Sequence, residues 1–154
     1  MPRESYVKRP LRITAGALLT RRGAESFYGY VVLEGTLGAF IDAEGDKSLI
    51  HDGEQVCFKR GALIGDTAII TDKPFIVTTR ALVDTTVIEI DAREIRRHIR
   101  GMPPILKGLL RVQAERVHQL VNDALHTHRS EVGVSEALLF SAVIGEAWID
   151  EKLR

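Results

Sequence analysis

The chain has 154 residues, of which 45% are hydrophobic and 27% charged, a composition typical of a globular domain and not of a disordered segment. Its 21 basic and 21 acidic residues give a formal net charge of zero, which argues against a protein that binds nucleic acid or an anionic membrane. The single cysteine, Cys57, excludes an intrachain disulfide and fits a reducing compartment, so we expect a cytoplasmic protein.

Short strands are expected over the first two-thirds of the chain. Runs of β-branched and aromatic residues alternate there with turns rich in glycine and aspartate. The expected strands are residues 30–33, 37–41, 48–51, 55–58, 75–79 and 86–90. Strands at this spacing predict a sandwich or a barrel. The charged N-terminus and the absence of an apolar run of about 20 residues predict neither a signal peptide nor a membrane span.

Helices are expected after the strands. Asp91 is a good N-cap residue and has Glu94 three places on, which predicts a short helix over residues 91–99. Pro104 suits the first turn of a second, longer helix that reaches about Thr127. A last apolar helix is expected over residues 135–153. We therefore divide the chain into a β domain, residues 1–100, and a helical extension, residues 101–154, that packs on the barrel, dimerises, or does both.

The long expected helix carries two apolar stripes. The first is a seam with coiled-coil-like spacing that includes Leu106, Leu110, Val117 and Leu120. The second, beside it, consists of Ile105, Leu109 and Val112. Either one stripe packs on the strands while the other meets a second copy, or both pack inside the monomer. We expect the first arrangement, and hence a homodimer.

A segment in the middle of the chain has the layout of a loop that cradles a phosphate. It runs from Arg60 to Thr79 and contains Gly65, Asp66, Thr67 and Ala68 at the start of a short helix. Backbone N–H groups at such a start are donors for an anion, and glycine allows close approach of the backbone.

The order and spacing of these pieces resemble the cyclic-nucleotide-binding domain, as in catabolite activator proteins, over about residues 11–120. The resemblance is carried by Gly23-Ala-Glu25, by Tyr30 to Gly35, by Arg60 to Ile69, by Pro74 and by residues 81–91. It implies a mainly β fold with C-terminal helices, an eight-stranded jelly-roll barrel. It also implies cAMP or cGMP as the ligand, with no cofactor.

The match fails at the residue on which anion binding most depends. In the family an arginine follows the proline at Pro74, and here Phe75 holds that place. A charge-assisted hydrogen bond contributes about 1.5–3 kcal/mol, so its loss weakens binding about tenfold to hundreds-fold. Phe75 either fills the cavity or stacks on a base, for which Thr78 is a further contact. We expect Arg80 to point to the opposite face of its strand and Lys73 to lie in solvent.

Other site chemistries find little support in the sequence. A metal cupin needs clustered histidines on strands, and the barrel region offers only His51. No nucleophile–base pair, Walker loop or dinucleotide fingerprint occurs, so we expect no catalytic residue and no metal. The basic cluster of Arg93, Arg96, Arg97, His98 and Arg100 could meet phosphate, but it is interpreted as a solvated helix face with local salt bridges. The stretch after the long helix is too short for a helix-turn-helix domain, so DNA binding is not expected.

The sequence therefore predicts a stand-alone, non-enzymatic regulatory module with a degenerate phosphate-binding cassette. It would act through protein contacts, with cyclic-nucleotide binding weak or lost. A genuine cAMP- or cGMP-responsive sensor stays open as the alternative. In that case Gly65, Asp66, Thr67 and Ala68 would contact the ligand.

Overall fold

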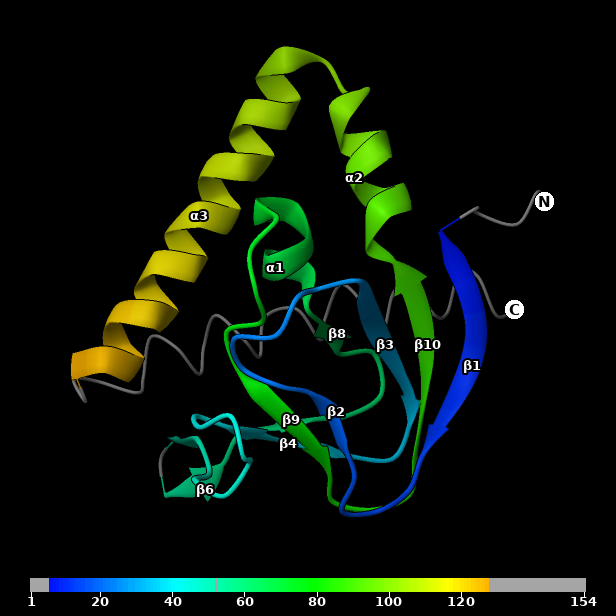
Figure 1. Ribbon diagram of the computed structural model, residues 1–154, viewed down its shortest axis with the longest axis vertical. Helices are drawn as coiled ribbons and strands as arrows, with labels where there is room; N and C mark the ends of the chain where they lie inside the picture. Colours follow the sequence, from blue (N-terminus) through cyan, green and yellow to red (C-terminus); the bar gives the residue numbers. More distant parts are fainter. Residues whose placement is uncertain (1–5, 52, 128–154) are drawn as a thin grey trace.

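Two antiparallel sheets and three helices make up the part of the chain that the computed structural model describes, residues 6–51 and 53–127 (Figure 1). In spatial order, the first sheet consists of β1 (Val7–Ile13), β10 (Thr85–Asp91), β3 (Tyr28–Glu34) and β8 (Leu63–Ile64). The second consists of β2 (Leu18–Thr20), β9 (Thr78–Ala81), β4 (Leu37–Phe40) and β7 (Cys57–Phe58). A small hairpin joins β5 (Ile50–His51) to β6 (Glu54–Gln55).

The three helices cover one end of the sheets. They are α1 (Asp66–Thr71), α2 (Ala92–Arg100) and α3 (Pro104–Thr127). In Figure 1, α2 and α3 form the two arms of a V, and the short α1 lies between them. This arrangement confirms the expected mainly β fold with C-terminal helices, and the two sheets supply the eight strands of a jelly roll.

Both sheets contribute to one apolar core. Val32 on β3, Val87 on β10 and Leu37 on β4 are fully buried in it. Val121 joins the same cluster from α3 and is also fully buried. Burial of a valine or leucine side chain stabilises the fold by about 1.5–3 kcal/mol, so the long helix is fixed to the barrel by its own core residues.

The register of the first sheet fixes where the helices begin. Antiparallel pairing of β3 with β10 places Tyr28 opposite Asp91, immediately before α2. As the spacing of Asp91 and Glu94 predicted, the Asp91 carboxylate accepts from the backbone N–H groups of Arg93 and Glu94 and caps α2. The basic residues Arg97, His98 and Arg100 lie in the last turn, where positive charge complements the helix dipole.

Several expected boundaries differ from the structure. The expected strand over residues 75–79 is displaced, since β9 begins at Thr78. The first two strands, β1 and β2, were not foreseen. The helix expected over residues 135–153 lies outside the described residues, and the division at residue 100 stays a prediction. Within the described ranges, no helix has the length and apolarity needed to cross a membrane.

Candidate functional site

The cassette is built around the start of α1. Gly65 is the N-cap residue of this helix and adopts a left-handed backbone conformation, with φ of 83°. This conformation is strained for residues with a Cβ and explains the glycine. Thr67 and Ala68 are buried in the first turn of α1. The short helix expected here is therefore present, and Gly65, Asp66, Thr67 and Ala68 lie together at its N-terminus.

The Phe75 ring lies directly on this N-terminus. A Cβ added to Gly65 would be 2.8 Å from Cε1 of Phe75. The backbone of Phe75 is held in place by the loop before β3, because its N–H donates to the Ala24 carbonyl and its carbonyl accepts from the Gly23 N–H. The ring therefore occupies the surface that a bound ligand would need to approach.

The space left beside the ring is small. The cassette cavity has a volume of about 20 Å³. Its lining is mainly apolar and includes Phe58, Leu63, Ile64, Phe75, Ile76 and Val77. A water molecule needs about 10–15 Å³ of such space, so this cavity has room for roughly one water. No lysine or arginine is among its described lining residues.

Asp66 lines the same cavity and competes for the donors of the cassette. Burial raises the pKa of its carboxyl above the ordinary value, although hydrogen bonds from the backbone N–H groups of Thr67 and of Asp66 itself act in the opposite direction. These are two of the N–H groups that we expected to bind a phosphate. A bound phosphate would therefore compete with the Asp66 carboxyl for these donors.

Two other residues considered at the sequence level lie elsewhere. Thr78 is fully buried on β9, and its hydroxyl accepts from the Arg22 N–H, so it is not part of the cavity lining. Arg80 points away as expected. Its guanidinium donates to the Gly16 carbonyl at 2.8 Å and to the Glu44 carbonyl at 3.0 Å. Arg80 therefore does not replace the missing cation.

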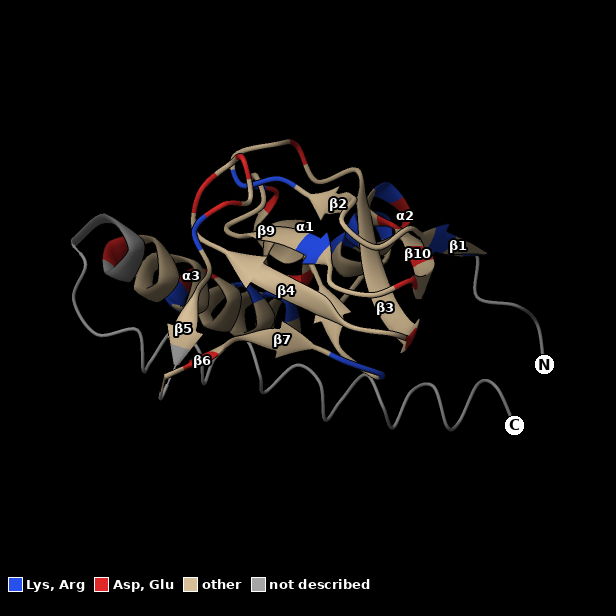
Figure 2. Ribbon diagram, turned by 90° about the horizontal axis from the view of Figure 1, so that it is seen from below, with Lys and Arg blue, Asp and Glu red and all other residues tan. Residues whose placement is uncertain are grey.

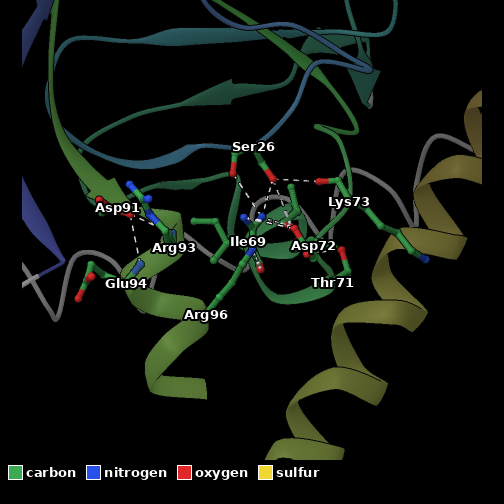
Figure 3. Close-up of polar contacts among 11 residues, drawn as sticks. Ser26, Ile69, Thr71, Asp72, Lys73, Asp91, Arg93, Glu94 and Arg96 are labelled. Atoms are coloured by element: carbon green, nitrogen blue, oxygen red, sulfur yellow. Dashed lines mark hydrogen bonds and ion pairs between the residues drawn. The ribbon is translucent and has the colours of Figure 1, made fainter. Parts of the chain in front are cut away.

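Arg96 on α2 contacts the C-terminal end of α1 (Figure 3). Its Nε donates to the Ile69 carbonyl at 2.9 Å, and its Nη2 donates to Ser26 Oγ at 2.8 Å and to the Ala68 carbonyl at 3.3 Å. Its Nη1 lies 3.3 Å from a carboxylate oxygen of Asp72. Helix C-termini leave carbonyls without intrahelical partners, and Arg96 gives the Ile69 carbonyl a charged donor. It is a further donor to the Ala68 carbonyl, which also accepts from the N–H groups of Asp72 and Lys73. The prediction that Arg96 is simply solvated was wrong.

A second link joins the cassette loop to α3. Lys73 Nζ lies 2.6 Å from Glu115 Oε2. The Lys73 side chain is 40% exposed, so it lies partly in solvent as expected and in addition forms an ion pair. His118 lies one turn further along α3, and burial and the charge of Lys73 lower its pKa. Its Nδ1 is buried and has no hydrogen-bond partner among the described residues. The spacing of residues in the sequence does not predict the contacts of Arg96 with α1 or of Lys73 with Glu115, because each contact joins segments far apart in the chain.

The structure divides the two stripes of α3 differently from the expectation. Of the seam, Val117 packs against the barrel core and Leu110 is half-buried, whereas Leu106 and Leu120 are exposed. The second stripe faces outward. Its exposed fractions are 70% for Ile105, 56% for Leu109 and 47% for Val112. The outward stripe, consisting of Ile105, Leu106, Leu109, Val112 and Leu120, is thus the apolar face without a partner in the described structure.

Comparison with known proteins agrees with this geometry. The family model for the cyclic nucleotide-binding domain matches residues 10–101, which is more than half of the chain. The chain belongs to this family. A cyclic nucleotide-binding domain is a regulatory, non-catalytic module, which fits a cassette without catalytic side chains.

The curated relatives are much longer proteins. The chain is 27% identical over 110 residues to patatin-like phospholipase domain-containing protein 6 of Mus musculus, which covers 70% of this chain and 8% of the relative. It is also 27% identical over 121 residues to lysophospholipase NTE1 of Phaeosphaeria nodorum, covering 79% of this chain and 8% of the relative. The chain thus spans only about a twelfth of these relatives, and the match says nothing of their enzymatic parts.

Solved structures share the fold at low sequence identity. The EAL enzyme Bd1971 in its cAMP- and cyclic-di-GMP-bound form has a TM-score of 0.60 at 16% identity, covering 73% of this chain and 28% of that one. The sensor domain of the transcriptional regulator DNR from Pseudomonas aeruginosa has a TM-score of 0.54 at 17% identity, covering 74% of each chain. These likenesses support the fold.

Proposed function

We propose that this protein is a non-enzymatic regulatory module whose cassette has weak or no affinity for cyclic nucleotides and which acts through protein contacts. The observation that carries the proposal is the Phe75 ring seated on Gly65, beside a cavity of about 20 Å³. Ligand pockets for small molecules have volumes of about 300–1,000 Å³. A cyclic nucleotide therefore enters only if the ring moves away.

Charge also disfavours the ligand. A cyclic phosphodiester would be buried beside the Asp66 carboxyl, whose pKa burial raises, with no lysine or arginine among the described residues that line the cavity. An uncompensated buried charge costs several kcal/mol. A phosphate would have to share the N–H groups of Asp66 and Thr67 with the Asp66 carboxyl, whose pKa they lower.

The protein contact that we propose is a homodimer through the outward stripe of α3. Five large apolar side chains, each at least 47% exposed, follow one side of this helix. Contiguous exposed apolar patches mark interaction sites in proteins, and a second copy supplies a matching stripe. We propose further that the protein is cytoplasmic and binds neither DNA nor membranes.

A genuine cAMP- or cGMP-responsive sensor is the second candidate. The retained frame of the cassette favours it, because Gly65 keeps its left-handed conformation and α1 is joined to α2 by Arg96 and to α3 by the Lys73 loop. The structural relative Bd1971 was solved with cAMP and with cGMP. In this alternative the Phe75 ring moves aside and stacks on the base.

Isothermal titration with cAMP and cGMP separates the two candidates. We expect no binding tighter than about ten micromolar by the wild-type chain, and a gain of at least tenfold in affinity in Phe75→Arg, because one charge-assisted pair contributes about 1.5–3 kcal/mol. Val83→Arg is the matched control, since it adds the same charge at an exposed position outside the cassette. Tight binding by the wild type, abolished in Gly65→Val, would establish the sensor.

A further inference from the structure

A second concave surface lies outside the cassette, where β3 begins beside α2. A cavity of about 570 Å³ is lined there by Phe27, Tyr28, Asp91, Arg93, Arg96 and Arg100, and we call it the arginine groove. The three arginines follow a spacing of three and four residues on α2, which places them on one face of the helix. The Phe27 carbonyl accepts from the Ala92 N–H, which holds the aromatic pair against the first turn of α2.

The charges of the arginine groove are unbalanced. The Asp91 carboxylate caps α2 and lies 3.7 Å from Lys8 Nζ, and Arg96 is occupied by α1. Arg93 and Arg100 are exposed, and their guanidinium groups form no ion pair within the described residues. Figure 2 shows the basic colour on α2 and on the neighbouring β1. The arginine groove therefore suits an anion.

Two aromatic residues also line the arginine groove. Phe27 is 66% exposed and Tyr28 is 39% exposed, directly beside these cations. Aromatic side chains together with arginine are the residues enriched in protein interfaces. A second cavity of about 350 Å³ adjoins the first and shares Phe27 and Arg96 with it. The second cavity is also lined by Glu25 and Asp72, so the positive charge is concentrated in the arginine groove.

We propose that the arginine groove docks the acidic segment Glu146–Glu151 of this same chain. The segment reads Glu-Ala-Trp-Ile-Asp-Glu and combines three carboxylates with the indole of Trp148. Carboxylates pair with the forks of Arg93 and Arg100, and an indole packs against exposed rings and guanidinium groups. This inference does not depend on whether the cassette binds a nucleotide.

Tethering favours this occupant over a free peptide of the same chemistry. The segment follows α3 in the same chain, and residues 128–154 lie outside the described residues. At ~3.3–3.6 Å per extended residue, the stretch between Thr127 and Glu146 is long enough to reach across a domain of this size. A tethered segment also has an effective concentration in the millimolar range, so modest contacts suffice to keep it bound.

Trp148 is the only tryptophan of the chain, so its fluorescence in the full-length protein tests the proposal directly. We expect acrylamide to quench wild-type Trp148 poorly. The quenching constant should rise about twofold or more, with a red shift of emission, at 1 M salt and in Arg93→Ala/Arg100→Ala, because charge pairing is screened or removed. Both replaced arginines are exposed, and near-ultraviolet circular dichroism verifies that the fold is retained.

The matched control is Arg111→Ala/Arg116→Ala, which removes two exposed arginines from α3. This pair should leave quenching at the wild-type level. The proposal is overturned if wild-type Trp148 is quenched like free tryptophan, or if only the control pair or Leu109→Ala exposes it. Protection that appears only as protein concentration rises would assign the contact to a second copy and overturn the docking within one chain.

A peptide of residues 144–154, added to the full chain, gives an independent readout. It should bind a Glu146→Gln/Asp150→Asn/Glu151→Gln variant, whose own segment has lost its charge, and fail to bind when Arg93→Ala and Arg100→Ala are also present. Equal binding with and without the two arginines would place the peptide elsewhere. Binding of an unrelated acidic peptide but not of this one would identify an external partner as the occupant, against the proposal.

Discussion

The ring of Phe75 and the missing Cβ of Gly65 are matched to each other. The left-handed φ of 83° requires glycine, and the 2.8 Å separation between Cε1 of Phe75 and an added Cβ leaves no room for a methyl group. The cassette thus keeps the glycine of a phosphate-binding loop and uses the close approach for an aromatic side chain instead. Phe75 and Gly65 thus both line an apolar cavity at the start of α1.

Gly65→Ala tests this packing. We expect a loss of about 1–3 kcal/mol in the free energy of unfolding, from backbone strain and from the clash with Phe75. Urea unfolding measures it. Gly108→Ala is the control, since nothing lies within 4 Å of a Cβ there and an alanine in helix α3 should stabilise by up to about 1 kcal/mol. If Phe75→Ala did not lessen the cost of Gly65→Ala, the two residues would not be coupled.

At the level of single residues, some features of the site could be predicted from the sequence and others could not. Phe75 could be identified because its place next to Pro74 is fixed by the chain itself. The raised pKa of Asp66 could not, because it depends on the burial of its carboxyl. In the sequence, Arg96 could not be distinguished from Arg97, which is exposed in the structure. Only the tertiary fold, which brings α1 against α2, distinguishes them.

At the level of the elements, Arg96 fixes α1 to α2. Arg96→Ala leaves the carbonyls of Ala68 and Ile69 without their charged donor, and we expect a loss of about 2–4 kcal/mol in unfolding free energy. Arg97→Ala, on the same helix, removes a pair that is largely exposed and should cost less than about 1 kcal/mol. Hydrogen exchange of the α1 amides should accelerate in Arg96→Ala and not in Arg97→Ala. Equal acceleration in both variants would contradict the conclusion that Arg96 fixes α1 to α2.

His118 on α3 is expected to make the free energy of unfolding depend on pH. Its pKa in the folded protein is lowered below 6.5, first by burial and then by the charge of Lys73, so the unfolded chain binds a proton more readily. The contribution to stability is present above pH 6.5 and is lost as the pH falls from that value through the lower pKa of the folded protein. His118→Gln should therefore lose less stability than the wild type between pH 7.5 and pH 5.5 in urea unfolding. Parallel losses in the two proteins would rule out this role.

For the molecule as a whole, the sequence predicted the central strands best. Residues 30–33 and 86–90 became β3 and β10, because their apolar residues fill the core between the sheets. The first strand was missed because Lys8, Arg9 and Pro10 contradict a buried strand. The structure places β1 at the edge of its sheet, with an irregular register before Pro10, where a missing N–H is tolerated.

The outward stripe of α3 predicts the state of assembly. We expect the wild-type chain to sediment as a dimer at micromolar concentration and Leu109→Lys to sediment as a monomer, because a charge in an apolar interface is costly to desolvate. Leu109 is 56% exposed, so the variant folds normally. Val83→Lys, equally exposed but outside α3, should stay dimeric. Sedimentation of the wild type as a monomer would contradict the proposed interface.

The proposal that Phe75 excludes a cyclic nucleotide is most directly tested by a crystal structure of the chain grown with millimolar cAMP. We expect the Phe75 ring to remain against Gly65, with no nucleotide density at the start of α1. A cyclic phosphate seated on the N–H groups of residues 65–68, with the ring turned away, would contradict it.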